Sequence, residues 1–480
     1  MNKYIIALAA ATSLCFGASA QSTHLRLDLK NSHAVSYPIS DIDSITYSSA
    51  KGNGMSHLNV NMGKKAEQYS LDNINVCALT NDIPVIDLVT DDGIYDVADK
   101  VNWHPGKITV TTNGYPGMEA LDGMAFQLRG RGNSTLGYPK KPYRIKFDKK
   151  TAIHSSMLKA KNYALIANYI DPTNMRNTVA FEIARSLDLP YTNHSIPVWV
   201  TLNGNDKGLY MLTEKIGLNS GSVYDIDEEK GILFEMDTYF DEDYKFRSEI
   251  YNMPVNVKDP DFAELQEDGV ISDPDEYLNL WKEDFSRIEN AMKLKGDEDL
   301  WDVLDLNTTV NFLLVYNLTG NCEVHHPKST YLHKTELGSS AKYSFCPVWD
   351  FDWAYTYGDG GEGSGSSTGY LFKGTGLGNN FFRDIVARDD FREAFAKAWD
   401  DFYKGGKFNE ILSFIDSYSS LIAPAAADNY DIWPPFNSGS DDPFADNISS
   451  LKKWLQERAE FISTADNFGF FAGTLTPPGT

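Results

Sequence analysis

The most constraining feature of the sequence is segment 347–353, Pro-Val-Trp-Asp-Phe-Asp-Trp, in which acidic and large aromatic residues alternate. If the segment is extended, Asp350 and Asp352 point to one face and the aromatic side chains to the other. Two neighbouring carboxylates repel each other unless a proton or a cation neutralises them. We therefore expect a site for a divalent ion such as Mg²⁺, which prefers oxygen ligands. The alternative is a solvated strand end, which is common for acidic residues.

The residues around this segment predict a β-hairpin that follows a helix. Residues 331–333 and 343–348 are apolar and β-prone, and the connection between them contains a glycine and two serines. Residues 307–319 are mostly apolar and predict a helix that Gly320 ends. This helix delivers Asn321 and Glu323 directly to the acidic hairpin.

Charge composition limits the ligands that the chain can take. The 67 acidic and 43 basic residues give a net charge of −24, which disfavours nucleic acid and anionic membranes as partners. Hydrophobic residues make up 42% and charged residues 23% of the chain, as is typical of a globular protein. A phosphate ligand therefore needs a local basic exception.

Residues 129–149 supply such an exception. They begin with Arg129-Gly-Arg-Gly-Asn-Ser and continue into a predicted strand, on which Arg144 and Lys146 share one face. The glycines at 130 and 132 allow close backbone approach to an anion. A charged edge hairpin, whose lysines discourage strand pairing, explains these residues equally well.

The first residues of the chain predict export. Residues 1–20 combine one positive charge, an apolar core and a small-x-small cleavage site after Ala20, as in a signal peptide. No later apolar run is long enough to span a bilayer. We therefore expect a secreted or periplasmic protein.

The remaining chain divides into a small and a large part. Residues 24–47 and 57–79 resemble each other, and each indicates a strand, a turn and a strand. Neither copy is long enough to bury a core alone. We expect a small β module at 23–80, with a spacer or docking role, and a main domain at 83–475.

Strands and helices both occur in the main domain, which predicts an α+β fold. Residues 172–187 indicate a helix that starts at Pro172 and Thr173 and carries Arg176. The glycine-rich run 358–369 indicates a mobile loop with the character of a lid. Three further helices are expected around 278–292, 391–402 and 448–462.

The cysteines and histidines leave two alternatives open. Cys322 and Cys346 flank the hairpin and are able to form a disulfide in an oxidising compartment, or to remain buried thiols. A zinc site from Glu323, His325, His326 and a cysteine is another hypothesis. Adjacent histidines cannot easily face one ion, and zinc ligands usually have wider spacing.

From about 83 to 461 the order of motifs resembles the CotH spore-coat protein kinase family. The motifs are Arg-Gly-x-Gly-Asn-Ser, Lys-Pro-Tyr-Arg-Ile-Lys, Met175-Arg-Asn, Leu202-Asn-Gly, Leu233-Phe-Glu-Met-Asp, Asn321 and Pro347-Val-Trp-Asp-Phe-Asp-Trp. The resemblance implies an atypical protein-kinase-like fold that transfers phosphate from ATP, with Mg²⁺, to Ser or Thr of extracytoplasmic proteins.

The resemblance also implies roles for particular residues. Glu323 and Asp350 are the expected catalytic residues, with Asp350 and Asp352 as Mg²⁺ ligands. The residues expected to contact ATP phosphates are Lys141, Arg144, Lys146 and Arg176. Together these roles require the basic strand and the acidic hairpin, for example Lys146 and Asp350, to share one cleft.

The sequence departs from the family pattern at two positions that bear on phosphoryl-transfer activity. Glu323 stands where the family has Asp, and Lys328-Ser329 replaces the usual Asn before the next strand. A misplacement of about 1 Å can cost ~10²-fold in rate. The alternative function is therefore a non-catalytic surface protein that acts in adhesion or glycan binding.

Overall fold

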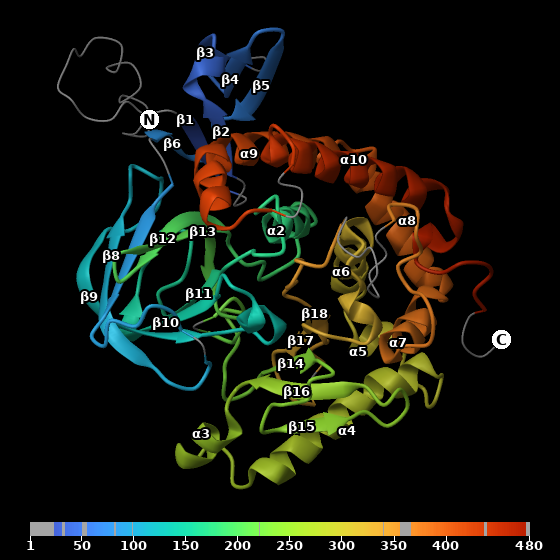
Figure 1. Ribbon diagram of the computed structural model, residues 1–480. Coiled ribbons are helices and arrows are strands. Elements are labelled where there is room, and N and C mark those ends of the chain that lie inside the picture. Colours follow the sequence, from blue (N-terminus) through green and yellow to red (C-terminus); the bar gives the residue numbers. More distant parts are fainter. Residues whose placement is uncertain are drawn as a thin grey trace.

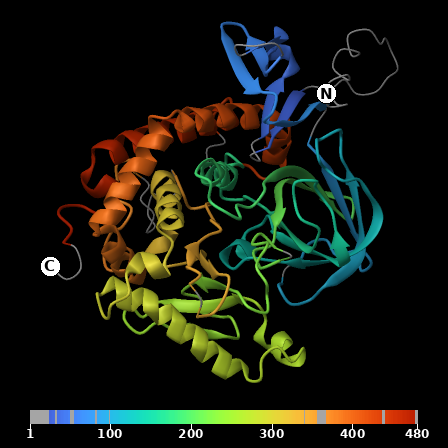
Figure 2. The ribbon, with the colours of Figure 1, turned by 180° about the vertical axis from the view of Figure 1, so that it is seen from behind.

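The computed structural model describes residues 24–30, 34–49, 55–80, 83–97, 99–219, 221–338, 340–355, 366–435 and 439–476. The predicted signal segment and most of the predicted lid lie outside these ranges. The described chain mixes helices and strands and begins with a β-rich region, which confirms the α+β class. Figures 1 and 2 show a small β module beside a larger body of barrel, sheet and helices.

Two three-stranded sheets form the N-terminal module, and the two sequence repeats exchange strands between them. One sheet has the order β2-β1-β6 and the other β3-β4-β5. The third strand of each repeat thus completes the sheet of the other repeat. The strands are β1 (His24–Leu29), β2 (Ala34–Pro38), β3 (Ser44–Ser48), β4 (His57–Met62), β5 (Lys65–Ser70) and β6 (Ile74–Thr80).

This exchange gives the two repeats a common core. Leu25 and Leu27 of the first repeat and Leu58 and Val60 of the second are buried in one hydrophobic cluster. The sequence predicts a strand, a turn and a strand for each repeat, whereas each contributes three strands. Because the third strand pairs outside its own repeat, neither repeat is a complete folding unit.

The module contacts the main domain through its first sheet. Strand β2 packs against helix α9 (Lys407–Ile432), which lies beside the module in Figure 1. The His24 Nε2 lies 3.1 Å from the Ser420 carbonyl oxygen. The Arg26 guanidinium lies 4.1 Å from the ring centre of Tyr115, a favourable cation–π arrangement.

A closed barrel forms the first half of the main domain, with strand order β10-β11-β13-β12-β7-β8-β9. Neighbouring strands are antiparallel except for the parallel pair β7 and β12. Its core includes Ile86, Leu128 and Val198, which have no exposed surface. The strands are β7 (Val85–Thr90), β8 (His104–Thr111), β9 (Leu121–Gly130), β10 (Tyr143–Thr151), β11 (Ala160–Ile166), β12 (Ile196–Leu202) and β13 (Asn205–Glu214).

A five-stranded sheet with the order β15-β16-β14-β17-β18 forms the second half. The predicted hairpin is its β17–β18 pair, in which Leu332 faces Phe345. The strands are β14 (Ile232–Met236), β15 (Lys245–Arg247), β16 (Pro254–Asp259), β17 (Thr330–Lys334) and β18 (Ser344–Phe345).

Helices cover the sheet and close the molecule along one side (Figure 1). They are α2 (Arg176–Ser186), α3 (Phe262–Glu267), α4 (Pro274–Met292), α5 (Leu300–Val303), α6 (Leu306–Thr319), α7 (Leu377–Val386), α8 (Asp389–Tyr403), α9 and α10 (Pro443–Thr464). Short 3₁₀ turns are η1 (Ile39–Asp41), η2 (Ser134–Gly137), η3 (Cys322–His325) and η4 (Asp466–Gly469).

Helix α6 confirms its prediction, whereas α2 begins later than predicted. Gly320 ends α6 in the left-handed conformation, with φ of 61°. Before α2, the Asp171 carboxylate accepts hydrogen bonds from the backbone N–H groups of Thr173 at 2.8 Å and Arg176 at 2.8 Å. These bonds hold residues 171–175 in a turn, so the helix starts at Arg176.

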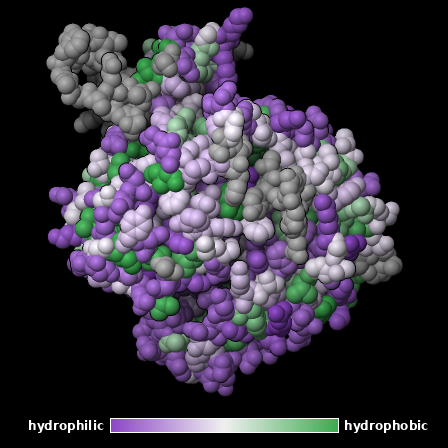
Figure 3. Space-filling view, viewed as in Figure 1, coloured by the Kyte–Doolittle hydropathy of each residue, from purple (hydrophilic) through white to green (hydrophobic). Residues whose placement is uncertain are grey.

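The outer surface of the molecule is predominantly polar. Figure 3 shows a mostly hydrophilic face on which hydrophobic residues are scattered. None of the helices in the described ranges is long and apolar enough to cross a membrane.

The shared core of the module predicts that its repeats unfold together. Leu27→Ala, in β1, should destabilise the module by about 2–5 kcal/mol and speed hydrogen exchange in β4 and β5 as well as in β1 and β2. Mass spectrometry of exchanged peptides measures this, with Val89→Ala in the half-exposed wall of the barrel as the control. Faster exchange in β1 and β2 alone would show that the repeats are independent.

Candidate active site

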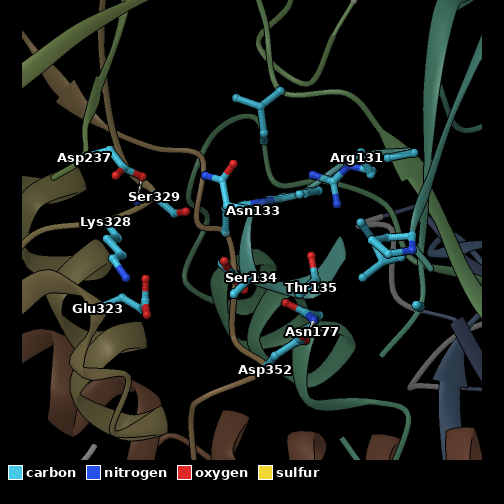
Figure 4. Close-up of a pocket in the computed structure, with 18 of the residues that line it drawn as sticks. Arg131, Asn133, Ser134, Thr135, Asn177, Asp237, Glu323, Lys328, Ser329 and Asp352 are labelled. Carbon is cyan, nitrogen blue, oxygen red and sulfur yellow. Dashed lines mark hydrogen bonds between the residues drawn. The ribbon is translucent and has the colours of Figure 1, made fainter. Parts of the chain in front are cut away.

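A cleft of about 660 Å³ lies between the barrel and the five-stranded sheet. Its lining comes from segments that are far apart in the sequence: the ends of β9 and β11, the end of β14, and the chain around η3 and Asp350. Figure 4 shows Arg131 on one side of this space and Glu323 and Lys328 on the other. The cleft therefore brings the basic and acidic segments together.

The acidic wall consists of Glu323, Asp350 and Asp352, which all line the cleft. The condition under which the sequence places both aspartates on one face, an extended strand through them, is not met. Strand β18 ends at Phe345, and Pro347 has no N–H with which to extend the ladder. Asp350 then adopts a left-handed conformation, with φ of 64°. An irregular turn, and not strand alternation, directs both carboxylates into the cleft.

Buried amide side chains fix the positions of these carboxylates. Asn321 accepts a hydrogen bond from the Glu323 N–H at 3.0 Å and donates one to the Asp350 carbonyl at 2.9 Å. Asn177, on α2, accepts from the Phe351 N–H at 2.8 Å and donates to the Asp352 carboxylate. Asn321 thus couples the η3 turn to the aspartate turn, and α2 anchors that turn from the opposite side.

The three carboxyl groups disfavour one another's ionisation. The pKa of Glu323 is raised to about 8, first by burial and then by the Asp350 charge, while Lys328 opposes the rise. The pKa of Asp352 is raised to about 7 by burial and by Asp350. The pKa of Asp350 is also raised by burial, against the effect of Arg131 and Lys328. The site therefore favours any ligand that brings positive charge.

A second acidic pair, which the sequence analysis missed, stands at the end of β14. The Glu235 carboxylate accepts a hydrogen bond from the Tyr331 hydroxyl at 2.6 Å and pairs with the Lys258 ammonium at 2.7 Å. The Asp237 carboxylate accepts from the Ser329 N–H at 3.3 Å, and burial and Glu235 raise its pKa to about 6. The motif Leu233-Phe-Glu-Met-Asp contains both residues but does not reveal their direction.

Arg131 is the principal cation that the sequence analysis missed. It lies in the loop after β9, lines the cleft, and places its guanidinium 5.4 Å from the ring centre of Trp349. Burial lowers its pKa, and the Asp350 and Asp352 carboxylates oppose this effect. The Arg-Gly-x-Gly motif contains Arg131, but only the folded chain places it opposite Asp350.

Gly130 and Gly132, the two glycines of this motif, are needed for the close packing of their own loop. A Cβ on Gly130 would lie 2.6 Å from the Asp99 carbonyl oxygen, and one on Gly132 would lie 2.1 Å from the Thr135 hydroxyl. Gly132 also has a φ of 80°, which favours glycine. The position that a Cβ would take on either glycine is therefore occupied by the chain's own atoms, so the loop itself requires both glycines.

Of the four basic residues expected to contact phosphate, Arg144 lines the cleft and the other three do not. The Lys141 Nζ donates to the Leu136 carbonyl at 2.8 Å, and the Lys146 Nζ lies 5.4 Å from the ring centre of Trp103. The Arg176 guanidinium donates to the Asp352 carbonyl at 2.8 Å and so supports the aspartate turn. The expectation that Lys146 and Asp350 share one cleft is wrong, because the basic strand reaches the cleft through Arg144.

The zinc and disulfide hypotheses receive no support from the described residues. The His325 Nε2 is in hydrogen-bond contact with the Leu371 carbonyl oxygen. Within the described ranges no group of three or more His, Cys, Asp or Glu side chains is placed to hold a metal ion unaided. Cys77, Cys322 and Cys346 are all free thiols.

The donor set nevertheless fits a Mg²⁺ ion that shares its ligands with phosphate. Asp350 and Asp352 both line the cleft, and the Asp350 charge raises the pKa of Asp352. Mg²⁺ is usually held by one or two carboxylates together with water and substrate phosphates. Two carboxylates that repel each other, opposite Arg131 and Arg144, meet this requirement.

These observations define a class of protein. Its cleft has carboxylates suited to a divalent ion on one wall and cations suited to phosphate oxygens on the other. The CotH kinase protein family matches residues 128–462, which is more than half of the chain. The chain therefore belongs to the CotH kinase family. None of the curated proteins matches it.

The raised pKa values predict a pH-dependent stability. The folded protein holds these protons more tightly than the unfolded chain does, so stability falls as the pH rises from 4.5, the ordinary pKa of glutamate, to about 8. Asp352→Asn removes one repelling charge and retains an acceptor for Asn177. It should stabilise the metal-free protein at pH 8 by about 1–3 kcal/mol and have little effect at pH 5.

Urea unfolding at both pH values measures this difference. Asp302→Asn, at an exposed position outside the cleft, is the matched control and should show no such gain. An equal effect of Asp352→Asn at pH 5 and pH 8 would contradict the proposed repulsion.

Proposed function

We propose that this protein is an exported, atypical protein kinase that transfers the γ-phosphoryl group of ATP to Ser or Thr of extracytoplasmic proteins. The observation that carries the proposal is the meeting of Arg131 and Arg144 with Glu323, Asp350 and Asp352 in one cleft. Phosphoryl transfer needs this division, with cations for the phosphate oxygens and carboxylates for the metal and the nucleophile. Membership of the CotH kinase family supports it.

The cleft residues have distinct parts in this reaction. Asp350 and Asp352 would hold Mg²⁺, which neutralises phosphate charge when bound. Arg131 and Arg144 orient the phosphate chain from the barrel side. The protein acceptor enters opposite the leaving ADP, because the attacking and leaving oxygens are roughly in line.

Glu323 is the group that handles the proton. The acceptor hydroxyl oxygen bonds to the γ-phosphorus, the bond from that phosphorus to the β–γ bridging oxygen breaks, and ADP leaves. The Glu323 carboxylate accepts the hydroxyl proton. Its pKa of about 8 makes it a stronger base than an ordinary carboxylate, and positioned bases with a pKa near the working pH are effective catalysts.

A hydrogen bond fixes the backbone that carries the Glu323 side chain, which is one methylene longer than that of Asp. The Asn321 side chain begins the η3 turn and fixes the Glu323 backbone through the 3.0 Å hydrogen bond. Figure 4 shows the carboxylate directed into the cleft, beside Lys328. We propose that the longer side chain works from this position as the base.

Export is part of the proposal because of the N-terminal sequence. Residues 1–20 have the charge, the apolar core and the cleavage site of a signal peptide. The acceptor would then be a secreted or surface protein.

Variants of the two catalytic residues test the proposal. Glu323→Gln should lower kcat by about 10²–10⁴-fold and leave ATP–Mg²⁺ binding in place. Asp350→Ala should abolish both, and a chelator of divalent ions should act like Asp350→Ala. Calorimetry measures binding, and radiolabelled ATP with dephosphorylated casein as the acceptor measures transfer.

Lys342→Met, on the exposed hairpin connection, is the control and should behave like the unaltered protein. Absence of ATP–Mg²⁺ binding, or full transfer by Asp350→Ala, would overturn the proposal. Binding without any transfer would favour a non-catalytic surface protein.

A further inference from the structure

Lys328 occupies a position in the cleft that the reaction described above does not use. It follows η3 and precedes β17, and its backbone N–H donates to the Glu323 carbonyl at 2.9 Å. This bond folds the chain back, so that the side chain lies beside the catalytic carboxylate. Figure 4 shows its ammonium end directed toward the Glu323 carboxylate.

Three carboxyl groups from different segments are close enough to interact electrostatically with this ammonium group. Lys328 acts electrostatically on Glu323, on Asp350 and on Asp237. The Tyr239 ring, whose centre is 5.0 Å from the Lys328 Nζ, borders the same space. Lys328 thus places a positive charge in a region where several carboxyl groups contribute negative charge.

Lys328 differs in this respect from Lys258 on the same cleft. The Lys258 ammonium lies 2.7 Å from both the Glu235 and the Glu242 carboxylate, so these two ion pairs already neutralise its charge. Lys328 and Arg131 lie on opposite sides of the cleft, with the space for a phosphate chain between them. An ammonium group there can bind phosphate oxygens as a point charge.

We propose that Lys328 is a tethered cation that binds the terminal phosphate of the nucleotide and does the work of a second divalent ion. Protein kinases commonly hold two Mg²⁺ ions, one on an aspartate and one on an asparagine of the catalytic loop. Here one divalent ion on Asp350 and Asp352 suffices, because Lys328 supplies positive charge on the Glu323 side. This inference rests on the proposed function.

Binding of a non-hydrolysable ATP analogue tests the inference without activity. Lys328→Met keeps the length of the side chain and removes its charge, so the Kd of the analogue at fixed Mg²⁺ should rise about tenfold or more. Binding should also come to depend on free Mg²⁺ above the concentration that saturates the unaltered protein. Lys328→Arg keeps the charge and should retain most of the affinity.

The control is Lys342→Met, and thermal unfolding of each variant reports its folding. If the unaltered protein binds the analogue and Lys328→Met binds it with the same Kd and the same Mg²⁺ dependence, the tethered-cation role is wrong and the kinase proposal stands. If Lys328→Arg loses binding as fully as Lys328→Met, charge is not what matters and the inference is again wrong. If the unaltered protein binds no nucleotide, both proposals fall together.

Discussion

The arrangement of residues in the central cleft depends on one interaction, the electrostatic repulsion among its carboxylates. Glu323, Asp350 and Asp352 lie on one wall of a cleft. Burial raises the pKa of all three, and the Asp350 charge raises the pKa of Glu323 and of Asp352 further. The folded chain offsets part of this cost with Arg131 and Lys328. The remaining repulsion would favour the proposed metal-bound phosphate ligand, because the positive charge of the metal ion would relieve it.

The irregular backbone around Asp350 is held by hydrogen bonds from regular elements. Helix α2 supplies Arg176 and Asn177, which bind the backbone and side chain of the aspartate turn. Asn321, directly after α6, binds the same turn from the other side. Rigid elements therefore position a turn that could not hold its own shape, which is the usual way in which catalytic side chains acquire fixed directions.

The N-terminal module and the main domain are joined by more than a linker. The exchanged third strands make the two repeats one unit, and β2 packs on α9. Further along α9, the Asn429 side chain accepts hydrogen bonds from the Lys140 ammonium at 2.9 Å and the Leu209 N–H at 3.1 Å. Lys140 lines the cleft, so one helix contacts both the module and the wall of the site.

The sequence by itself determined the elements that depend on local chemistry. Gly320 predicted the end of α6, and the apolar, β-prone residues predicted the β17–β18 hairpin. The acidic and basic segments led to the hypothesis of a site for a metal ion and phosphate. It could not determine which member of each segment enters the cleft. Of the expected basic residues only Arg144 lines the cleft, together with Arg131, which was not expected there, and Asp350 has a left-handed backbone conformation. Those directions arise from contacts between segments that lie far apart in the sequence, such as Arg131 and Trp349, and no local periodicity encodes such contacts.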